Sequence, residues 1–345
     1  MGEIPLDKVN LKKAIGFPEL EYAVPAHANT FLYSLGGLTL ICFVLSFVTG
    51  AILTQFYNPT PTVAHASVNY IANTTWLRLI RALHHWSANL GFILLIGHML
   101  RVMFTGAFRP PRTITYLAGL LLLFVSFQLF FTGTVLKWDQ EGYEAMEHFV
   151  AVNKLLGPFG AVFQEDFTLS TSMLARLYAL HIGIFPALLL ILIVVHFVYI
   201  KIFGIAPKPF QSQDAYQESL SKGAKFTQHL KLLLLYGSIL LVVLVILAIV
   251  FPPALLDKPR PGIEVTKPPW VFWIFYPIES AIGIPGILLG TAILSIGLIL
   301  VPIFGLIINR EKILFRTVRI VVTAGLVIWF VLLAITYFSP VMQHL

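Results

Sequence analysis

The chain has 345 residues, of which 58% are hydrophobic and only 11% are charged, and its formal net charge is +7. Soluble globular proteins carry about 25% charged residues, so this composition excludes that class and indicates an integral membrane protein. The positive charge does not point to a nucleic-acid partner, because most of the lysines and arginines fall on one side of the predicted membrane spans.

Seven apolar runs are close to or above the ~20 residues that an α-helix needs to cross a bilayer. We therefore predict an all-α, polytopic membrane protein with about seven transmembrane helices. The predicted spans are 31–55, 79–104, 114–136, 174–204, 229–251, 284–308 and 317–338. By the positive-inside rule, the N-terminus lies on the cytoplasmic, negative side of what we expect to be a bacterial or archaeal inner membrane, and the C-terminus lies opposite.

Residues 1–30 contain several charges and Pro25 but no compact apolar core or small-residue cleavage site. We predict a cytoplasmic or interfacial segment there rather than a removable signal peptide. The one cysteine, Cys42, lies among Leu, Ile and Phe in the first span. It excludes an internal disulfide and a cysteine-held cluster, and we interpret it as a small packing residue.

The connections between the spans differ in character. The four longer ones are 57–75, 137–172, 203–228 and 251–283. The first is polar and rich in turn residues, and the second is acidic and long enough to indicate a functional loop. The third is basic, and we interpret it as a hinge between a four-helix portion, residues 31–210, and a three-helix portion, residues 211–345. The fourth is rich in Pro and Trp and cannot be one continuous helix.

Histidines recur inside two of the predicted spans. His84 and His98 are fourteen residues apart in the second span, and His181 and His196 are fifteen apart in the fourth. Because these spans run in the same direction, His84 lies at the depth of His181, and His98 at that of His196. Ionisable groups inside a membrane are costly and mark candidate functional sites. Two pairs about 20 Å apart along the axis predict two haem sites, because imidazoles on both faces of the iron suit electron transfer.

Glycines and arginines accompany these histidines. Four glycines stand in pairs fourteen residues apart, in the first and third spans: Gly36, Gly50, Gly119 and Gly133. Fourteen residues make almost four turns, so each pair shares a helix face, and we expect it to leave room for porphyrin edges. Arg81 and Arg101 stand three residues from His84 and His98, on the same helix face. We expect them to neutralise haem propionates.

The other histidines have simpler interpretations. His85 lies roughly 100° round the helix from His84, and we interpret it as a packing or hydrogen-bonding residue. Five further histidines fall in loops or at ends, where we expect solvated side chains: His27, His65, His148, His229 and His344. The axial separation excludes a single closed zinc site for the histidines of the spans, because such a site needs four converging ligands. A transporter would show two matching halves with broken helices, and no matching half is evident.

At these residues the sequence resembles the cytochrome b family of quinol:cytochrome c and plastoquinol:plastocyanin oxidoreductases. The motifs are LGGLTLICFVLSFVTG, IRALHHWSANLGF, TGTVLKWDQEGY and LYALHIGIFP. The likeness is greatest to the split type of plastids and cyanobacteria, in which a four-helix cytochrome b pairs with a separate three-helix subunit. Both parts are fused here. The resemblance implies two haem b groups, with His84 and His181 as iron ligands of one and His98 and His196 as those of the other.

Two positions depart from the family pattern. The split type carries a cysteine that bonds a third haem, and Ser34 stands at the matching position, so we predict no covalent haem on this chain. The outer quinol-site motif of the family, PEWY, is replaced by Pro268, Pro269, Trp270 and Val271. Its carboxylate, which would receive a quinol proton, is missing.

Three other carboxylates are candidates for that proton transfer. By sequence, the nearest are Glu141, Glu144 and Glu279, and a general base must lie within hydrogen-bond reach of the proton it takes. We predict that a carboxylate of the 137–172 connection takes over at the outer site, beside Pro269 and Trp270. The alternative is that these glutamates are solvated surface charges.

The resemblance implies the cytochrome b subunit of a quinol:cytochrome c-type oxidoreductase. Two b haems would carry electrons across the membrane between an outer quinol-oxidation site and an inner quinone-reduction site, bordered by His27, Lys201 and Asp214. It also implies a Rieske-type iron–sulfur protein and a c-type cytochrome as partners, in a homodimeric complex within the lipid membrane. The alternative is a di-haem membrane anchor of another quinone-linked redox complex, with a single quinone site.

Overall fold

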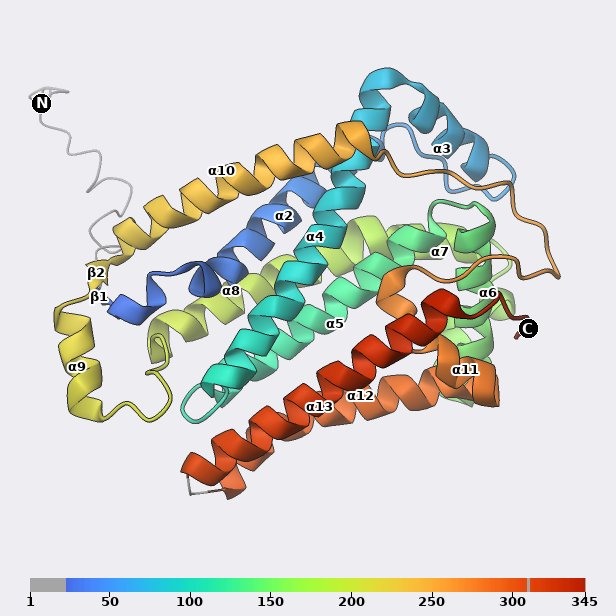
Figure 1. The fold of residues 1–345 in the computed structure, drawn as a ribbon. Coiled ribbons are helices and arrows are strands. Elements are labelled where there is room, and N and C mark those ends of the chain that lie inside the picture. Colours follow the sequence, from blue (N-terminus) through green and yellow to red (C-terminus); the bar gives the residue numbers. More distant parts are fainter. Residues whose placement is uncertain (1–22, 309–310, 345) are drawn as a thin grey trace, which may run out of the picture.

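The computed structural model describes residues 23–308 and 311–344 and is almost entirely helical (Figure 1). Within these ranges, seven helices are long and apolar enough to cross a membrane. They are α2 (Phe31–Leu53), α4 (Thr75–Thr105), α5 (Thr113–Val135), the continuous span Met173–Phe203, α10 (Phe226–Val250), α12 (Pro285–Ile307) and α13 (Glu311–Phe338). The predicted all-α membrane fold and its number of spans are confirmed.

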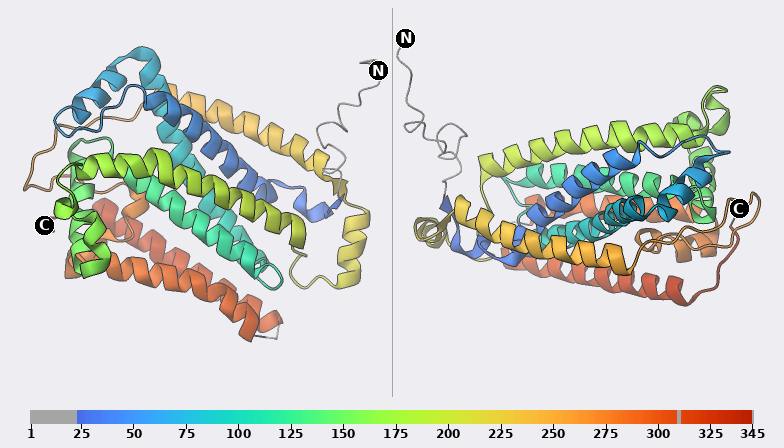
Figure 2. Two further views of the ribbon diagram at one scale, coloured as in Figure 1. Left: turned by 180° about the vertical axis from the view of Figure 1, so that it is seen from behind. Right: turned by 90° about the horizontal axis from the view of Figure 1, so that it is seen from above.

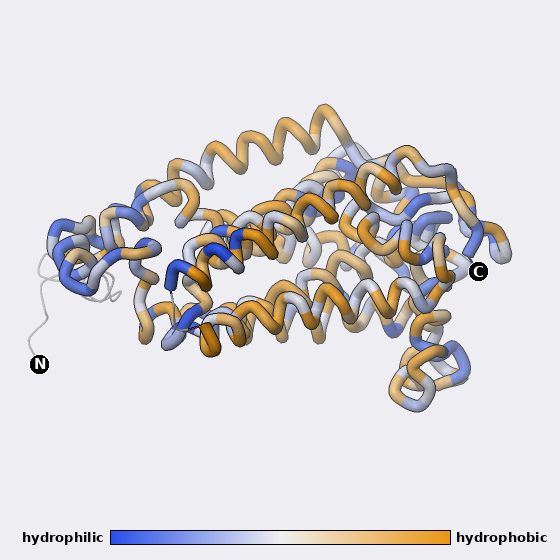
Figure 3. Tube along the Cα trace, turned by 60° about the horizontal axis from the view of Figure 1, so that its bottom comes forward, coloured by the Kyte–Doolittle hydropathy of each residue, from blue (hydrophilic) through white to orange (hydrophobic). Residues whose placement is uncertain are grey.

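The spans run side by side between the two ends of the molecule (Figure 2). We call the end where α2 begins the inner end and the opposite end the outer end. Hydrophilic residues gather at these ends, and the middle of the molecule is hydrophobic (Figure 3). Large apolar side chains are exposed on the surface of the spans: Ile191 is 60% exposed, Val194 61% and Leu234 69%. Such a continuous apolar surface marks contact with lipid rather than water.

Short elements close the two ends. The outer end holds α3 (Ala64–Asn73), α6 (Gln140–Leu155), η4 (Gly157–Phe163), η5 (Glu165–Phe167), η7 (Trp270–Phe272) and α11 (Tyr276–Ile282). The inner end holds η3 (Ala26–Ala28), α9 (Gln213–Ser221) and the antiparallel pair of β1 (Ala23–Val24) with β2 (Ala224–Lys225). Of the predicted N-terminal interfacial segment, residues 1–22 lie outside the described residues.

Two expectations about the helices need correction. The last span begins six residues earlier than predicted, because basic residues such as Arg316 extend from the first turns of α13 without ending the helix. Long cationic side chains at a membrane surface keep their charge in water while the stem lies along apolar surface. The connection 57–75 is not only turns, since it contains α3. Ala64, Val68 and Ile71 recur at helical spacing there and form its buried face.

Helix α4 packs against α2, α10, α13 and α5, whereas the span Met173–Phe203 packs on α5. Helices α2 and α4 approach closely at Gly91, where a Cβ atom would lie 2.9 Å from the Cβ of Cys42. Cys42 is fully buried, as expected of a packing residue. Helix α10 packs on α2 and α4, whereas α12 and α13 lie together beside α5 and α4 (Figures 1 and 2). The three long helices of residues 211–345 therefore flank the first four spans from two sides.

Candidate functional site

The structure brings the four histidines of the spans into two pairs. The ring centroids of His84 and His181 are 6.3 Å apart, with an interplanar angle of 71°. Those of His98 and His196 are 6.5 Å apart, at 77°. We call these four residues the interior histidines, His84 with His181 being the outer pair and His98 with His196 the inner pair. The pairing is the one that the sequence predicts.

A π-helical turn explains how unequal spacings produce matched pairs. The fourth span consists of α7 (Met173–Ala179), the π-helix η6 (Leu180–Ile184) and α8 (Phe185–Phe203). A π turn accommodates one more residue than an α turn and often marks a functional site. The fifteen-residue interval from His181 to His196 therefore turns through about the same angle as the fourteen-residue interval in α4. Both histidines consequently face α4.

The distance within each pair fits a shared metal ion. Two imidazoles bound to one metal from opposite sides, at about 2.0 Å per bond, would have ring centres about 6 Å apart once the radius of each ring is added. Nearly the same separation occurs in both pairs, at the two depths predicted from the sequence. The residues present therefore fit bis-histidine ligation of haem iron.

Contacts of the Nδ1 atoms orient the rings of the outer pair for binding a metal. The Nδ1 atom of His84 lies 2.9 Å from the backbone carbonyl of Ser46, and that of His181 lies 2.9 Å from Oγ1 of Thr132. When Nδ1–H donates to an oxygen, Nε2 keeps its lone pair for a metal. No described residue forms a hydrogen bond with Nε2 of either ring. The outer pair is thus arranged to bind through Nε2.

The inner pair has a cation beside it. Nη2 of Arg101 lies 3.3 Å from Nδ1 of His98, and its guanidinium carbon lies 4.6 Å from the ring centre of Tyr33. Arginine can only donate hydrogen bonds, so this contact makes Nδ1 of His98 the acceptor. The Nε atom of Arg101 is buried without a hydrogen bond. No carboxylate among the described residues forms an ion pair with Arg101, so its guanidinium fits an anionic group such as a propionate, to which it would turn from His98.

Arg81 is held differently. Its two terminal nitrogens donate to the backbone carbonyls of Pro253 and Ala254, at 2.7 and 3.0 Å. These bonds anchor the start of the 251–283 connection to α4. The contacts of Arg81 therefore support a role toward a propionate less well than those of Arg101, because the terminal nitrogens of Arg81 already donate to carbonyl oxygens.

Each of the four glycines faces one interior histidine. A Cβ atom at Gly36, Gly50 or Gly133 would lie 3.0, 3.0 or 3.1 Å from Cε1 of His98, His84 or His181 respectively, and one at Gly119 would lie 3.5 Å from that of His196. The structure thus gives them a further role: they leave room for the imidazoles. Their contact with porphyrin edges stays a prediction.

His85 belongs to a polar chain that reaches the altered motif. Nδ2 of Asn89 donates to the carbonyl of His85 and lies 3.3 Å from its Nε2. Oδ1 of Asn89 accepts from Nε1 of Trp270 at 2.7 Å. The indole also meets Phe92 and Phe130 edge to face, at 6.2 and 6.4 Å. His85 is therefore a hydrogen-bonding residue, and Trp270 lies at the outer end between α4 and α5.

The two carboxylates of the 137–172 connection that are predicted proton acceptors, Glu141 and Glu144, differ in how free their oxygens are to accept a proton. Glu144 is 5% exposed and accepts hydrogen bonds from Nε2 of Gln140, the backbone N–H groups of Val265 and Thr266, and the hydroxyl of Thr266. Glu141 pairs with Lys137, and burial raises its pKa although Lys137 opposes the shift. Neither glutamate is a solvated surface charge. Glu141 has the more available carboxylate, since the oxygens of Glu144 are occupied.

Two histidines that we expected to be solvated are partly buried at the outer end. The side chain of His148 is 20% exposed and that of His344 is 5% exposed, beside the buried carboxylates of Glu264 and Glu279. Burial would lower the pKa of His148, but the two carboxylates prevail and raise it to about 9. The sequence signal that was missed is the side of the membrane: all four residues fall on the outer side when the spans are counted.

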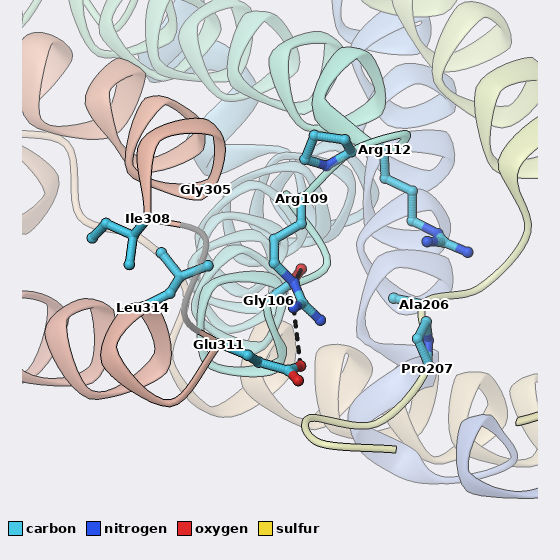
Figure 4. Close-up of a pocket in the computed structure, with 10 residues that line it drawn as sticks. Gly106, Arg109, Arg112, Ala206, Pro207, Gly305, Ile308, Glu311 and Leu314 are labelled. Atoms are coloured by element: carbon cyan, nitrogen blue, oxygen red, sulfur yellow. Dashed lines mark hydrogen bonds and ion pairs between the residues drawn. The ribbon is translucent and has the colours of Figure 1, made fainter. Parts of the chain in front are cut away.

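At the inner end, a cavity of about 360 Å³ opens between α4, α12 and α13 (Figure 4). Arg109 and Glu311 form an ion pair of 3.0 Å in its wall. His27 approaches the lining residue Ala206, with Nε2 3.1 Å from the carbonyl oxygen. Burial lowers the pKa of His27, a shift that this carbonyl partly opposes.

The other two residues predicted for the inner quinone site are Lys201 and Asp214. Both are exposed, and neither lines this cavity. Of the three predicted residues, only His27 is thus linked to the cavity, through Ala206.

The family model described as Cytochrome b/b6/petB matches residues 20–204. Cytochrome b6 of Heliobacterium modesticaldum is 40% identical over 191 residues, which cover 54% of this chain and 90% of that protein. Cytochrome b6 of Rippkaea orientalis is 38% identical over 190 residues, covering 53% and 84%. A chain of a solved structure, the Hyperthermophilic respiratory Complex III, matches with a TM-score of 0.70 over 96% of this chain and 97% of that chain, at 19% identity. This last likeness supports the fold across the whole length.

Proposed function

Since this chain belongs to the cytochrome b family, we propose that its two histidine pairs hold two b haems that connect an outer quinol site with an inner quinone site. The chain is the cytochrome b subunit of a quinol-oxidising bc-type complex, an integral membrane oxidoreductase. The observation that carries the proposal is the repeated 6.3 and 6.5 Å separation of the imidazole pairs.

When bound, a haem iron held by two imidazoles supplies one-electron transfer and has no open position for oxygen or substrate. His84 and His181 would hold the iron of one haem at the outer end, and His98 and His196 would hold that of the other at the inner end. Ser46 and Thr132 fix the ring orientation of the outer pair. Arg101 supplies a buried positive charge beside the inner pair, which favours an anionic group there.

At the outer end, the residues around Trp270 form an aromatic wall. Phe131 meets Phe149 and Phe272 at 5.0 and 6.3 Å, and Phe127 meets Phe272 at 4.9 Å. Aromatic side chains with a few polar groups are typical of sites for flat, mainly apolar ligands. We place quinol oxidation here, with Pro269 and Trp270 at its border.

A quinol releases two protons and two electrons when it is oxidised. Glu141 would accept a proton, because its raised pKa brings it nearer to the working pH of a general base. Glu144 would hold the 251–283 connection against α6. One electron would go to a Rieske-type iron–sulfur protein and then to a c-type cytochrome, and the other would enter the chain at the outer pair.

The inner quinone site would lie at the inner end, near His27, Lys201 and Asp214. The cavity beside Ala206 and the ion pair of Arg109 support a polar, accessible region there. The inner end would face the cytoplasm, in keeping with its excess of lysine and arginine. The complex would be a homodimer in a bacterial or archaeal inner membrane.

Subunit composition and haem content test this proposal. The complex purified from its membrane should contain an iron–sulfur protein, a c-type cytochrome and two non-covalent b haems per copy of this chain. His98→Ala should remove one b haem. A b-haem spectrum unchanged by this substitution would overturn the assignment.

A separate experiment concerns the outer carboxylates. Glu141→Gln should lower the rate of quinol oxidation and alter its pH profile, whereas Glu144→Gln should mainly lower the thermal stability of the complex, by about 1–3 kcal/mol for the lost charged acceptor. Quinol oxidation that is unchanged at every pH in the double variant would remove these carboxylates from the mechanism.

The second candidate function is a di-haem membrane anchor with a single quinone site. The observation that favours it is the absence of a carboxylate in the Pro268-Pro269-Trp270-Val271 motif. An anchor would not reduce a high-potential cytochrome c with quinol, and outer-site inhibitors would not affect it. The leading proposal requires both cytochrome c reduction and its inhibition.

A further inference from the structure

A second cluster of ligand-type side chains lies at the outer end. It consists of His148 on α6, Glu264 in the 251–283 connection, Glu279 on α11 and His344 near the C-terminus. We call these four residues the outer-end cluster. Figure 1 shows α6, α11 and the C-terminus gathered at the same end of the molecule. Residues separated by nearly 200 positions along the chain thus converge on one point.

The distances within the cluster match those between ligands of one ion. Nε2 of His148 lies 3.3 Å from Oε1 of Glu264 and 3.1 Å from Oε1 of Glu279, and Nδ1 of His344 lies 3.5 Å from Oε2 of Glu264. One ligand atom each from His148, Glu279 and His344 lies within 4.8 Å of the others. Ligand atoms around a tetrahedral ion at about 2.0–2.1 Å are roughly 3.3–3.4 Å apart.

Hydrogen bonds engage only part of the carboxylates of the cluster: Oε2 of Glu264 accepts from the backbone N–H of His344 at 2.5 Å. The side chains of Glu264 and Glu279 are only 6% and 5% exposed, yet Oε1 of each accepts no hydrogen bond. Both Oε1 atoms instead form ion pairs with the same atom, Nε2 of His148. Two buried negative charges therefore face one imidazole, which is costly, whereas one divalent cation would neutralise both carboxylates and contact each of them.

The outer nitrogen of each imidazole is already held. Nδ1 of His148 lies 2.7 Å from the backbone carbonyl of Glu144, so its proton points away from the cluster. Nε2 of His344 lies 3.1 Å from the hydroxyl of Ser280. A histidine that ligates a metal typically donates its second N–H to an oxygen in this way, which fixes the ring and its tautomer. Nε2 of His148 and Nδ1 of His344 are the nitrogens left facing the carboxylates.

We propose that the outer-end cluster binds one divalent transition-metal ion of the zinc type, through Nε2 of His148, Nδ1 of His344 and one oxygen of Glu279. The ion draws one oxygen of Glu264, which contacts both histidines, into the fourth position. Two imidazoles with two carboxylates suit Zn²⁺, whereas Mg²⁺ and Ca²⁺ prefer sites made of oxygen alone. Four protein ligands leave no open position, so this is a structural site. It joins the C-terminal residues to α6 and α11 independently of the haem sites.

Metal analysis of the purified whole complex tests this site. The complex is stripped with a chelator and titrated with Zn²⁺, and bound zinc is measured against haem iron. We expect one zinc ion per chain, and X-ray absorption at the zinc edge should give two nitrogen and two oxygen ligands at about 2.0–2.1 Å.

Variants locate the ion. Glu279→Gln and His344→Ala should each weaken zinc binding more than about 100-fold, because they remove a direct ligand rather than an outer contact. His65→Ala is the matched control: its Nε2 lies 2.9 Å from the carbonyl oxygen of Leu256, away from the cluster, and zinc binding should be unchanged.

Three results would overturn the proposal: no stoichiometric zinc in the wild-type complex, equal zinc binding in all variants, or an absorption spectrum without imidazole scattering. The spectrum uses the wild-type protein, so it decides the question even if a variant fails to assemble.

Discussion

The interior histidines and the outer-end cluster place imidazoles in opposite surroundings. The interior histidines lie among glycines, hydroxyls and backbone carbonyls, with no carboxylate among their described partners. In the outer-end cluster, two carboxylates face two imidazoles. The first arrangement suits a neutral ligand for a planar, bulky metal group, and the second suits a compact cation. The same side chain thus serves two chemistries because its neighbours differ.

Among the substitutions that test this difference, removal of an interior histidine should have the largest effect on haem content and activity. His181→Ala should abolish one b haem and reduce quinol-dependent cytochrome c reduction to background, because the outer pair loses an axial ligand. Haem content measured per chain and redox-difference spectra would show the loss.

His85→Ala is the control for that variant, since His85 is adjacent to a ligand in sequence but bonds to Asn89 instead. Both b haems should remain in it. Equal haem loss in the two variants would mean that the membrane histidines act only in folding, and the contrast with the outer-end cluster would disappear.

Glycine substitutions test whether the interior histidines need the space that the glycines leave beside them. Gly36→Ala would place a Cβ atom 3.0 Å from Cε1 of His98, whereas Gly119→Ala would place one at an ordinary 3.5 Å from Cε1 of His196. We expect Gly36→Ala to destabilise the inner pair by about 1–3 kcal/mol, the usual cost of overpacking, and Gly119→Ala to be tolerated. Haem retention during thermal unfolding measures both variants, and the reverse order would contradict the argument.

These two regions also differ in how far the sequence could predict them. Spans and interior histidines follow from apolar length and from the intervals 84 to 98 and 181 to 196, because a helix converts spacing into direction. The π turn at Leu180–Ile184 was not predicted. Its only trace is the extra residue in the second interval, next to Pro186, which cannot donate a backbone hydrogen bond.

The outer-end cluster escaped prediction because no periodicity links its members. His148, Glu264, Glu279 and His344 come from four separate segments, and each alone has the appearance of a solvated loop residue. Their meeting depends on how α6, α11 and the C-terminal residues fold over the outer end, which is tertiary information. Glu144 was likewise expected near a substrate, but the structure shows its carboxylate engaged by Val265 and Thr266.

Replacing Arg101 and Arg81 by neutral glutamine tests how the charge of each arginine affects the haem beside it. Arg101→Gln should lower the reduction potential of the inner haem by the equivalent of about 1–2 kcal/mol, because a buried positive charge that favours the reduced state is lost. Potentiometric titration measures this shift.

Arg81→Gln provides the comparison for that titration, since the guanidinium of Arg81 is bound to the carbonyls of Pro253 and Ala254. It should mainly loosen the connection and shift the outer haem less. A larger shift of the haem reduction potential in Arg81→Gln than in Arg101→Gln would contradict the view that Arg101, rather than Arg81, acts on a haem.

The smallest expected effect concerns one hydrogen bond. Thr132→Val removes the hydroxyl that lies 2.9 Å from Nδ1 of His181, at a cost of about 0.5–1.5 kcal/mol, and should broaden the spectrum of the outer haem as the ring loses its fixed orientation. Thr134→Val removes a hydroxyl two residues further along α5, roughly on the opposite side of the helix, whose hydrogen bond goes to the carbonyl of Phe130 on the same helix. The spectrum of this variant should match the wild type. Identical spectra in both variants would show that packing against Gly133, rather than the threonine hydroxyl, orients His181.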